Sequence, residues 1–322
     1  MNDQPRTRRD FLTRGAHAAG ALGLSGTIAQ AAGFATDPAT AAPPADDERP
    51  LVIDGMMHLE VVGKHWEGLI DEVLAHYEAA KIDKGVILTT WMPTKKSNDR
   101  TLAAYEKHPD RFIPFGHIRP QDDEWESELK RIAQPPWKGL KLLHGEFARH
   151  AGDDLQGTVR RMFDKIAEVG IKVVKIHLQV PEIVEELTRA FPKIMFIFPH
   201  LGAWNEPRNT HTKAFCELAR GRENVYLDTS GFASYWDMAK WIREAGVEKV
   251  TFASDGFLCS PLVEKAKVES LALPTQDRTP PFTRDELALV LGGNMARILG
   301  IDAKTERGRR SSAERTGTKP AG

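Results

Sequence analysis

Short apolar, β-branched runs alternate with longer segments of helical periodicity from residue 51 onward. We expect strands at Leu51–Asp54, Gly85–Thr90, Arg111–His117, Gly139–Leu143, Lys172–His177, Ile194–Pro199, Asn224–Asp228 and Lys249–Ser254. Between them, apolar residues recur at helical spacing, as at Val159, Met162, Phe163 and Ile166. This alternation predicts parallel strands joined by right-handed helical crossovers. Eight such units in about 250 residues have the size of a (β/α)8 barrel, so we predict a distorted, single-domain α/β TIM barrel over residues 51–301.

A doubly wound open sheet is the alternative fold for this alternation. Such a sheet carries a glycine-rich phosphate-binding turn after its first strand. Nothing like Gly-x-Gly-x-x-Gly follows Leu51–Asp54, which favours the barrel. The last helical segment, Thr283–Leu299, has Asp285 and Glu286 near its start, as the N-terminus of a helix favours.

Both ends of the chain depart from the barrel pattern. Thr7–Leu12 resembles a twin-arginine export signal, and a weakly apolar stretch rich in Ala and Gly follows it, ending near the small residues of Ala29–Ala31. We therefore predict a signal peptide over residues 1–31, a linker over residues 32–50, and export in folded form to the periplasm or the extracellular space. A chance pair of arginines in a disordered tail is the alternative. Residues 302–322 are rich in Lys, Arg, Ser and Thr, and we predict that they are disordered.

The charge balance excludes several classes of partner. Lys and Arg total 44 against 45 Asp and Glu, and this balance gives no electrostatic case for nucleic acid or an anionic membrane. Cys216 and Cys259 are too few for a disulfide framework or a thiolate zinc site. We expect a small-molecule substrate, no membrane contact after export, and a homodimer as one option for assembly.

Titratable side chains recur where the expected strands end. His58 lies just beyond the first strand, His177 ends the fifth, His200 follows the sixth and Asp255 follows the eighth. Active sites of parallel barrels form at the C-terminal ends of the strands, so we expect these side chains to meet at one mouth. Imidazoles and a carboxylate suit a divalent ion, with zinc expected first and manganese second.

The strand-end motifs resemble those of the amidohydrolase-related metalloenzymes (amidohydrolase family 2), the group that includes the aminocarboxymuconate-semialdehyde decarboxylase-like proteins. The matching segments are Ile53–His58, Gly139–Leu142, Ile176–His177, Phe198–Gly202, Ala253–Asp255 and Gly293–Gly300. Their order covers residues 51 to 301. The resemblance implies a metal-dependent TIM-barrel hydrolase.

The first strand departs from the family pattern Asp-x-His-x-His, because Met56 stands in place of the first histidine and only His58 remains. Three explanations stay open. The metal binds through His58, His177 and Asp255, with water in the gap; or the site shifts outward and Glu60 joins His58; or the metal is lost. In the third case the barrel is a ligand-binding protein or a metal-free enzyme. We do not expect ligation by Met56, because a thioether prefers soft ions such as Cu(I).

The resemblance also implies roles for the strand-end residues. His58 and His177 would be ligands, Asp255 a ligand or the proton acceptor of a metal-bound water, and His200 a hydrogen-bond donor or acid. Members of the family hydrolyse C–O or C–N bonds or decarboxylate aromatic or enoic acids. We predict a hydrolase acting on a small cyclic or carboxylate-bearing substrate such as a lactone. A non-oxidative decarboxylase is the second hypothesis, and a non-catalytic binding barrel is the third.

Further residues near the strand ends are candidates for contact with substrate. A decarboxylase needs a cation to seat the carboxylate, and Arg119 and Lys141 are the candidates. His144 is a further candidate for contact with substrate, although it is one residue further from Lys141 than the histidine of the family's Lys-x-His. Trp91 and Trp204 follow the second and sixth strands and would wall a cyclic substrate.

Overall fold

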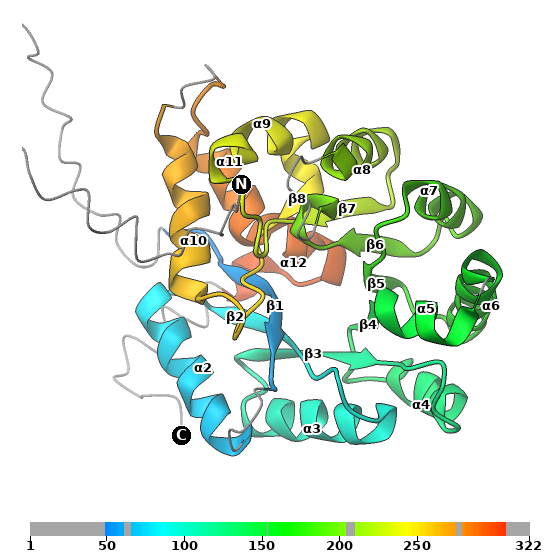
Figure 1. The fold of residues 1–322 in the computed structure, drawn as a ribbon. Coiled ribbons are helices and arrows are strands. Elements are labelled where there is room, and N and C mark those ends of the chain that lie inside the picture. Colours follow the sequence, from blue (N-terminus) through cyan, green and yellow to red (C-terminus); the bar gives the residue numbers. More distant parts are fainter. Residues whose placement is uncertain (1–48, 61–65, 153, 204–209, 275–278, 307–322) are drawn as a thin grey trace, which may run out of the picture. The chain divides into compact units, whose positions relative to one another are not determined.

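A computed structural model of the chain describes residues 49–60, 66–152, 154–203, 210–274 and 279–306, all within one compact unit (Figure 1). Eight parallel strands follow one another around the sheet in sequence order. They are β1 (Ile53–His58), β2 (Lys84–Leu88), β3 (Phe112–His117), β4 (Gly139–Leu143), β5 (Val173–His177), β6 (Met195–Phe198), β7 (Val225–Asp228) and β8 (Val250–Thr251). The predicted (β/α)8 barrel is confirmed. The predicted signal peptide lies outside the described residues.

Helices surround the sheet and connect its strands (Figure 1). They are α2 (Trp66–Ala80), α3 (Thr94–Lys107), α4 (Trp125–Ile132), α5 (His144–Ala151), α6 (Leu155–Glu168), α7 (Pro181–Ala190), α8 (Thr210–Gly221), α9 (Tyr235–Ala245), α10 (Pro261–Glu269), α11 (Arg284–Ala288) and α12 (Asn294–Leu299). A capping box of Thr283 and Glu286 begins α11, in line with the acidic residues expected there. Among the helices described, none is long and apolar enough to cross a membrane.

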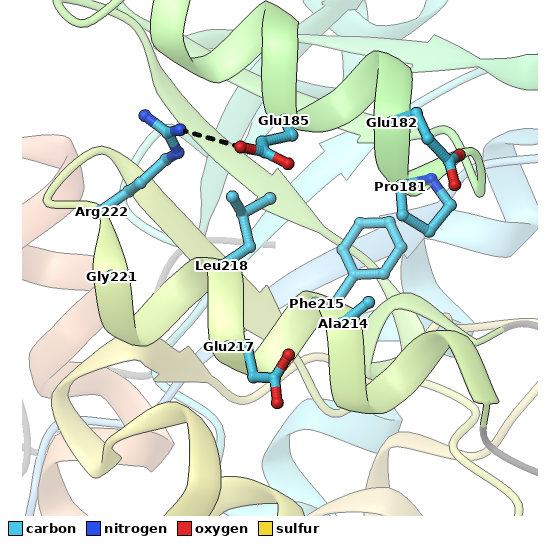
Figure 2. Close-up of a pocket in the computed structure, with 9 residues that line it drawn as sticks. All are labelled: Pro181, Glu182, Glu185, Ala214, Phe215, Glu217, Leu218, Gly221 and Arg222. Atoms are coloured by element: carbon cyan, nitrogen blue, oxygen red, sulfur yellow. Dashed lines mark ion pairs between the residues drawn. The ribbon is translucent and has the colours of Figure 1, made fainter.

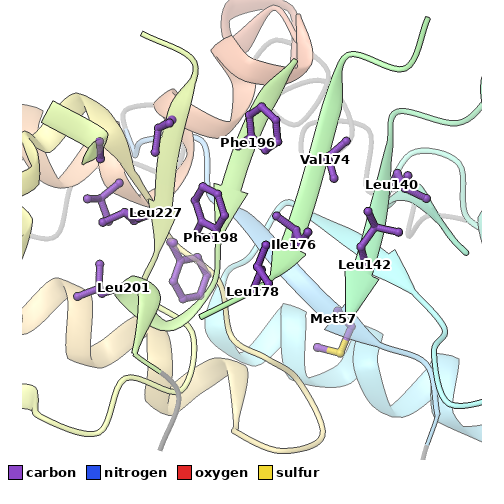
Figure 3. Close-up of a cluster of buried hydrophobic side chains, with 14 of the residues drawn as sticks. Met57, Leu140, Leu142, Val174, Ile176, Leu178, Phe196, Phe198, Leu201 and Leu227 are labelled. Atoms are coloured by element: carbon purple, nitrogen blue, oxygen red, sulfur yellow. The ribbon is translucent and has the colours of Figure 1, made fainter. Parts of the chain in front are cut away.

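Alternation along the strands separates an outer apolar layer from the barrel interior. Leu140, Leu142, Val174 and Ile176 belong to the large cluster that packs between sheet and helices (Figure 3). Lys141, between the two leucines, therefore points the other way, into the barrel. This interior position makes Lys141 a buried cation rather than a surface charge.

Strand β1 is irregular at the point where the family motif departs. Its register against β2 shifts between Asp54 and Met57, so β1 holds one extra residue. Ile53 and Met56 consequently both join the inner apolar cluster although they are three positions apart. Regular alternation would place Asp54 on the same face as Met56. Instead the Asp54 carboxylate accepts a hydrogen bond from the hydroxyl of Tyr77 on α2, at 2.9 Å.

The barrel is nearly closed between β8 and β1 by separate contacts rather than by a continuous ladder. The Gly55 amide donates to the Phe252 carbonyl at 2.9 Å, and the Gly256 amide donates to the Met56 carbonyl at 3.3 Å. These bonds bring the segment that carries Asp255 against β1. Beyond the barrel, the predicted tail is described as far as Glu306, and residues 307–322 lie outside the described part.

Candidate functional site

His58 ends β1 and joins two carboxylates in the barrel mouth. Its Nδ1 lies 3.1 Å from Glu60 Oε1, and its Nε2 lies 3.3 Å from Asp255 Oδ1. The amide and hydroxyl of Thr90 both donate to the same Glu60 oxygen, at 2.6 Å. Glu60 and Asp255 therefore flank opposite nitrogens of one buried ring.

The charges of this group depend on each other. Burial opposes the imidazolium, but hydrogen bonds to Asp255 and Glu60 outweigh it and raise the pKa of His58 to about 9. Burial would also raise the pKa of Asp255, but the hydrogen bond and charge of His58 lower it to about 2. At neutral pH the two residues form a buried ion pair, and His58 stores a proton.

Lys141 brings a second cation to the mouth. Its ammonium donates to Met56 Sδ at 3.3 Å, and both side chains are buried. Because β1 and β4 are not neighbours in the sheet, this contact crosses the barrel interior. Burial, together with repulsion from Lys175, lowers the pKa of Lys141 to about 8, against attraction from Asp255. Lys141 is thus mainly an ammonium at neutral pH.

Two neutral histidines lie beside this cation. The rings of His177 and His200 meet edge to face, with centroids 5.3 Å apart. Burial, then the charge of Lys141, lower the pKa of His177 to about 3. Burial likewise lowers the pKa of His200.

The hydrogen bonds of His200 define its tautomer. Its Nδ1 lies 2.6 Å from the carbonyl oxygen of Ser230, so in the neutral ring Nδ1 carries the proton and Nε2 is the acceptor nitrogen. The backbone amide of His200 donates to Asp228 Oδ1 at 3.2 Å. The predicted role of His200 as donor through Nε2 would therefore require the imidazolium, whereas this arrangement suits proton acceptance.

Three residues at the mouth have backbones in the left-handed region. Trp91, His200 and Asp255 have φ values of 53°, 60° and 56°. For residues with a Cβ atom such conformations are strained by roughly 1–3 kcal/mol each, and they concentrate at functional sites. The chain thus bears local strain at three of the strand ends where the sequence indicates chemistry.

Trp91 presents an aromatic surface beside His58. The two rings are stacked, with centroids 5.5 Å apart and planes 10° apart, and Trp91 is 59% exposed. Its predicted counterpart, Trp204, lies outside the described residues. Of the two predicted tryptophans, Trp91 is therefore the one that the structure places for contact with a planar substrate.

The other predicted substrate contacts differ in position. His144 begins α5 and lies near enough to His177 to contribute to the low pKa of that ring. Arg119 Nε lies 3.5 Å from Glu146 Oε1, and the other Glu146 oxygen lies 3.1 Å from His117 Nε2. The charge of Arg119 is thus directed at a carboxylate of the protein, which leaves Lys141 as the better-placed cation for a substrate.

Two residues that the sequence interpretation did not single out support this arrangement. His117 ends β3, and its Nδ1 lies 3.0 Å from the Lys141 carbonyl. Asp228 ends β7, pairs with Lys175 inside the barrel and accepts from the amide of His200. Both carry the same strand-end signal as His177, so that rule could have found them.

The donor set only partly suits the metal ion that the resemblance implies. The 3.3 Å separation of His58 Nε2 and Asp255 Oδ1 is close to the ~3.4 Å expected for two ligands of one tetrahedral zinc ion. However, no three His, Cys, Asp or Glu side chains of the described residues are arranged to hold an ion. Met56 occupies the sequence position of a further family ligand, and its Sδ contacts the Lys141 ammonium. As arranged, these residues do not fit the metal.

The outward-shifted site with Glu60 fits less well still. Glu60 contacts Nδ1 of His58, whereas Asp255 contacts Nε2. One ion cannot be bound through both nitrogens of a ring, so Glu60 and Asp255 could not share an ion held by His58. Glu60 is better placed to orient His58.

A hollow of about 480 Å³ lies away from this mouth, between α7 and α8 (Figure 2). Glu185 of α7 and Arg222, just after α8, form an ion pair there at 3.7 Å. None of the candidate strand-end residues lines it. We therefore place the candidate site at the mouth and not in this hollow.

Residues 69–301 match the sequence profile of the amidohydrolase family. The match begins after β1, the strand that holds Met56 and His58. No curated protein sequence matches the chain.

Several solved structures share the fold. A 5-carboxyvanillate decarboxylase from Novosphingobium aromaticivorans with bound manganese has a TM-score of 0.56 and 14% identity, over 79% of this chain and 98% of that chain. A 2,6-dihydroxybenzoate decarboxylase from Rhizobium has a TM-score of 0.55 and 14% identity, over 78% of this chain and 98% of that chain. A 4-oxalomesaconate hydratase from Rhodopseudomonas palustris has a TM-score of 0.54 and 15% identity, over 83% of this chain and 100% of that chain. At these identities the likeness concerns the fold.

Proposed function

The chain belongs to the amidohydrolase family, and from this premise we propose that it is a carboxy-lyase that removes the carboxylate of a small, ring-bearing acid as CO₂ without oxidation. One observation carries this proposal: the buried ammonium of Lys141 lies in the barrel interior against Met56, and its charge acts on His177 and Asp255. An ammonium in a low-dielectric site binds a carboxylate through charge-assisted hydrogen bonds. We thus place decarboxylation ahead of the hydrolysis expected from the sequence.

Lys141 would seat the acid, and Trp91 would contact the face of its ring. When the C–C bond to the carboxylate breaks, the electron pair remains on the substrate carbon, which must take a proton. The His58 imidazolium holds a proton for this step, and Asp255, 3.3 Å from its Nε2, can transfer that proton to the substrate carbon. The net reaction consumes one proton and releases one CO₂, with no redox change.

Two of the compared structures are named as decarboxylases of ring acids, 5-carboxyvanillate and 2,6-dihydroxybenzoate. This chain shares their fold, and their names support the choice of a ring acid as substrate class. The manganese of the first structure belongs to that protein.

Hydrolysis is the second candidate, and the tautomer of His200 favours it. A neutral histidine whose Nε2 is the acceptor can take the proton of an attacking water. A small lactone is the substrate class for this reaction, as expected from the sequence. The two reactions differ in their products, since hydrolysis adds the elements of water and decarboxylation removes CO₂.

The purified chain should be incubated with a panel of hydroxybenzoates and small lactones, and the products identified by mass spectrometry. We expect loss of CO₂ from at least one ring acid. Lys141→Met, which keeps side-chain length without charge, should reduce the rate by ~10–100-fold, the effect of losing one charge-assisted hydrogen bond.

Lys130→Met is the matched control, because Lys130 is exposed on α4 and should leave the rate unchanged. Water addition to a lactone without CO₂ release would establish the hydrolase instead. Binding of panel compounds without turnover would point to the ligand-binding barrel.

A further inference from the structure

We infer that the ammonium of Lys141 is the resident cation of this barrel mouth and takes the place that the family resemblance assigns to a divalent metal ion. The inference deepens the proposed function by naming the cation of its site. It can be tested separately, because metal binding is measured without substrate.

Two departures from a metal site are in direct contact with each other. Met56 replaces a histidine of the family motif, and its Sδ accepts the Lys141 ammonium at 3.3 Å. A thioether is a weak hydrogen-bond acceptor and a poor ligand for zinc or manganese. Met56, which lacks the imidazole nitrogen of the family motif, therefore contacts the ammonium of Lys141, which supplies a positive charge.

Three carboxylates and a second ammonium surround that of Lys141. Asp255, Asp228 and Glu60 attract it, and Lys175 repels it. The positive charge of Lys175 is partly offset by its own ion pair with Asp228. With the His58 imidazolium included, these groups carry three negative and two positive charges, so the surroundings of Lys141 remain net acidic, as they would be around a bound cation.

The predicted ligands also face this cation. The Lys141 charge acts on both His177 and Asp255. Two of the three predicted metal ligands are thus subject to the charge of this ammonium, and the third, His58, already pairs with Asp255 at 3.3 Å. A divalent ion at the same place would be repelled by the ammonium at short range in a buried site. Metal and ammonium are therefore alternatives at this position.

The experiment uses the full chain and three variants: Met56→His, Lys141→Met and the double variant Met56→His/Lys141→Met. Each protein is incubated with Zn²⁺ or Mn²⁺ and dialysed, and its metal content is measured by mass spectrometry and its Kd by calorimetry. We expect the wild type to retain well below one ion per chain. The double variant should retain close to one, with a Kd at least ~100-fold lower than that of the wild type. Asp255→Ala in the double variant should abolish this gain.

A wild type that retains one zinc or manganese ion per chain, and loses it in Asp255→Ala, would overturn the inference. So would a double variant that is folded by circular dichroism and binds no ion, because the mouth would then not be the metal's place. If the double variant does not fold, the metal content of the wild type still decides. CO₂ release and metal content, measured before and after chelator treatment, separate the two proposals. Release only while one ion is bound would refute only the inference. A wild type that binds no ion before treatment and releases no CO₂ would refute only the carboxy-lyase.

Discussion

At the scale of single residues, burial of a charge is unfavourable unless opposite charges face it. Lys141 meets this condition through Asp255 and Asp228, and His58 meets it through Asp255 and Glu60. Such compensated buried charges, gathered at one end of a barrel, indicate a chemical role. The pKa values of the two residues shift in opposite directions: that of Lys141 is lowered and that of His58 is raised.

The lowered pKa of Lys141 leads to a prediction for activity. The ammonium loses its proton near pH 8, about two units earlier than a free lysine, so kcat/KM should fall above about pH 8. Lys141→Arg keeps its charge to higher pH and should shift this fall upward, even at a lower maximal rate. A pH–rate profile of both proteins measures the shift. A wild-type profile that stays level to about pH 10 would show that the charge of Lys141 is not needed.

Trp91 permits a prediction for substrate binding. Its exposed ring is stacked on His58, so Trp91→Ala should raise KM about three- to tenfold for a ring acid, with kcat nearly unchanged. Steady-state kinetics test this. Trp236→Ala is the control, because Trp236 on α9 is 69% exposed and outside the described contacts of the mouth. Equal effects of the two substitutions would contradict the role of Trp91.

At the scale of elements, most strand positions could be predicted and their irregularities could not. The expected strand Gly139–Leu143 is observed with the same bounds, but the first expected strand, Leu51–Asp54, is observed as Ile53–His58. The extra residue of β1 arises from its pairing with β2 and its contacts with β8. Apolar periodicity reports on burial within one segment, so it does not reveal a register shift between two strands.

Asp54 holds three elements together, and its pKa leads to a prediction for stability. It accepts hydrogen bonds from Tyr77 of α2 and from the Ser254 amide after β8, and burial raises its pKa from 3.8 to about 6. Between these values folded Asp54 binds more protons than Asp54 in the unfolded state, so its own contribution to the free energy of unfolding should fall as pH rises, by ~3 kcal/mol in total.

Denaturant unfolding of the wild type and Asp54→Asn between about pH 4 and pH 6 tests this prediction. Asn has a similar shape but no charge, so the free energy of unfolding of the wild type should fall with rising pH relative to that of the variant. Parallel slopes in the two proteins would assign the pH dependence to other groups. The lowered pKa of His177, about 3, acts in the opposite direction within this window, because the unfolded imidazole binds more protons, but it does so equally in both proteins. The depressed pKa of Asp255, about 2, also opposes Asp54, but only below this window.

At the scale of the whole molecule, the chain belongs to the amidohydrolase family, and its export by the twin-arginine route is a proposal. The pair Arg8–Arg9 lies outside the described residues, and we propose that it directs export of the folded protein. Arg8→Lys/Arg9→Lys should retain the protein in the cytoplasm, because the export receptor reads the guanidinium pair, whereas Arg6→Lys should have no effect. Cell fractionation with an immunoblot measures this, and unchanged export of the double variant would refute the proposal.

The sequence by itself determined the fold class, the strand ends that carry His58, His177, His200 and Asp255, and the loss of a histidine at Met56. These follow from local periodicity and from the rule that parallel strands end at one mouth. Only the tertiary structure decided which side chains meet. The contact between Lys141 and Met56 joins residues 85 positions apart, and the hydrogen bond from Ser254 to Asp54 joins residues 200 positions apart. Whether a cation site holds a metal ion or an ammonium depends on such long-range contacts, because charge compensation acts through space and leaves no local pattern in the chain.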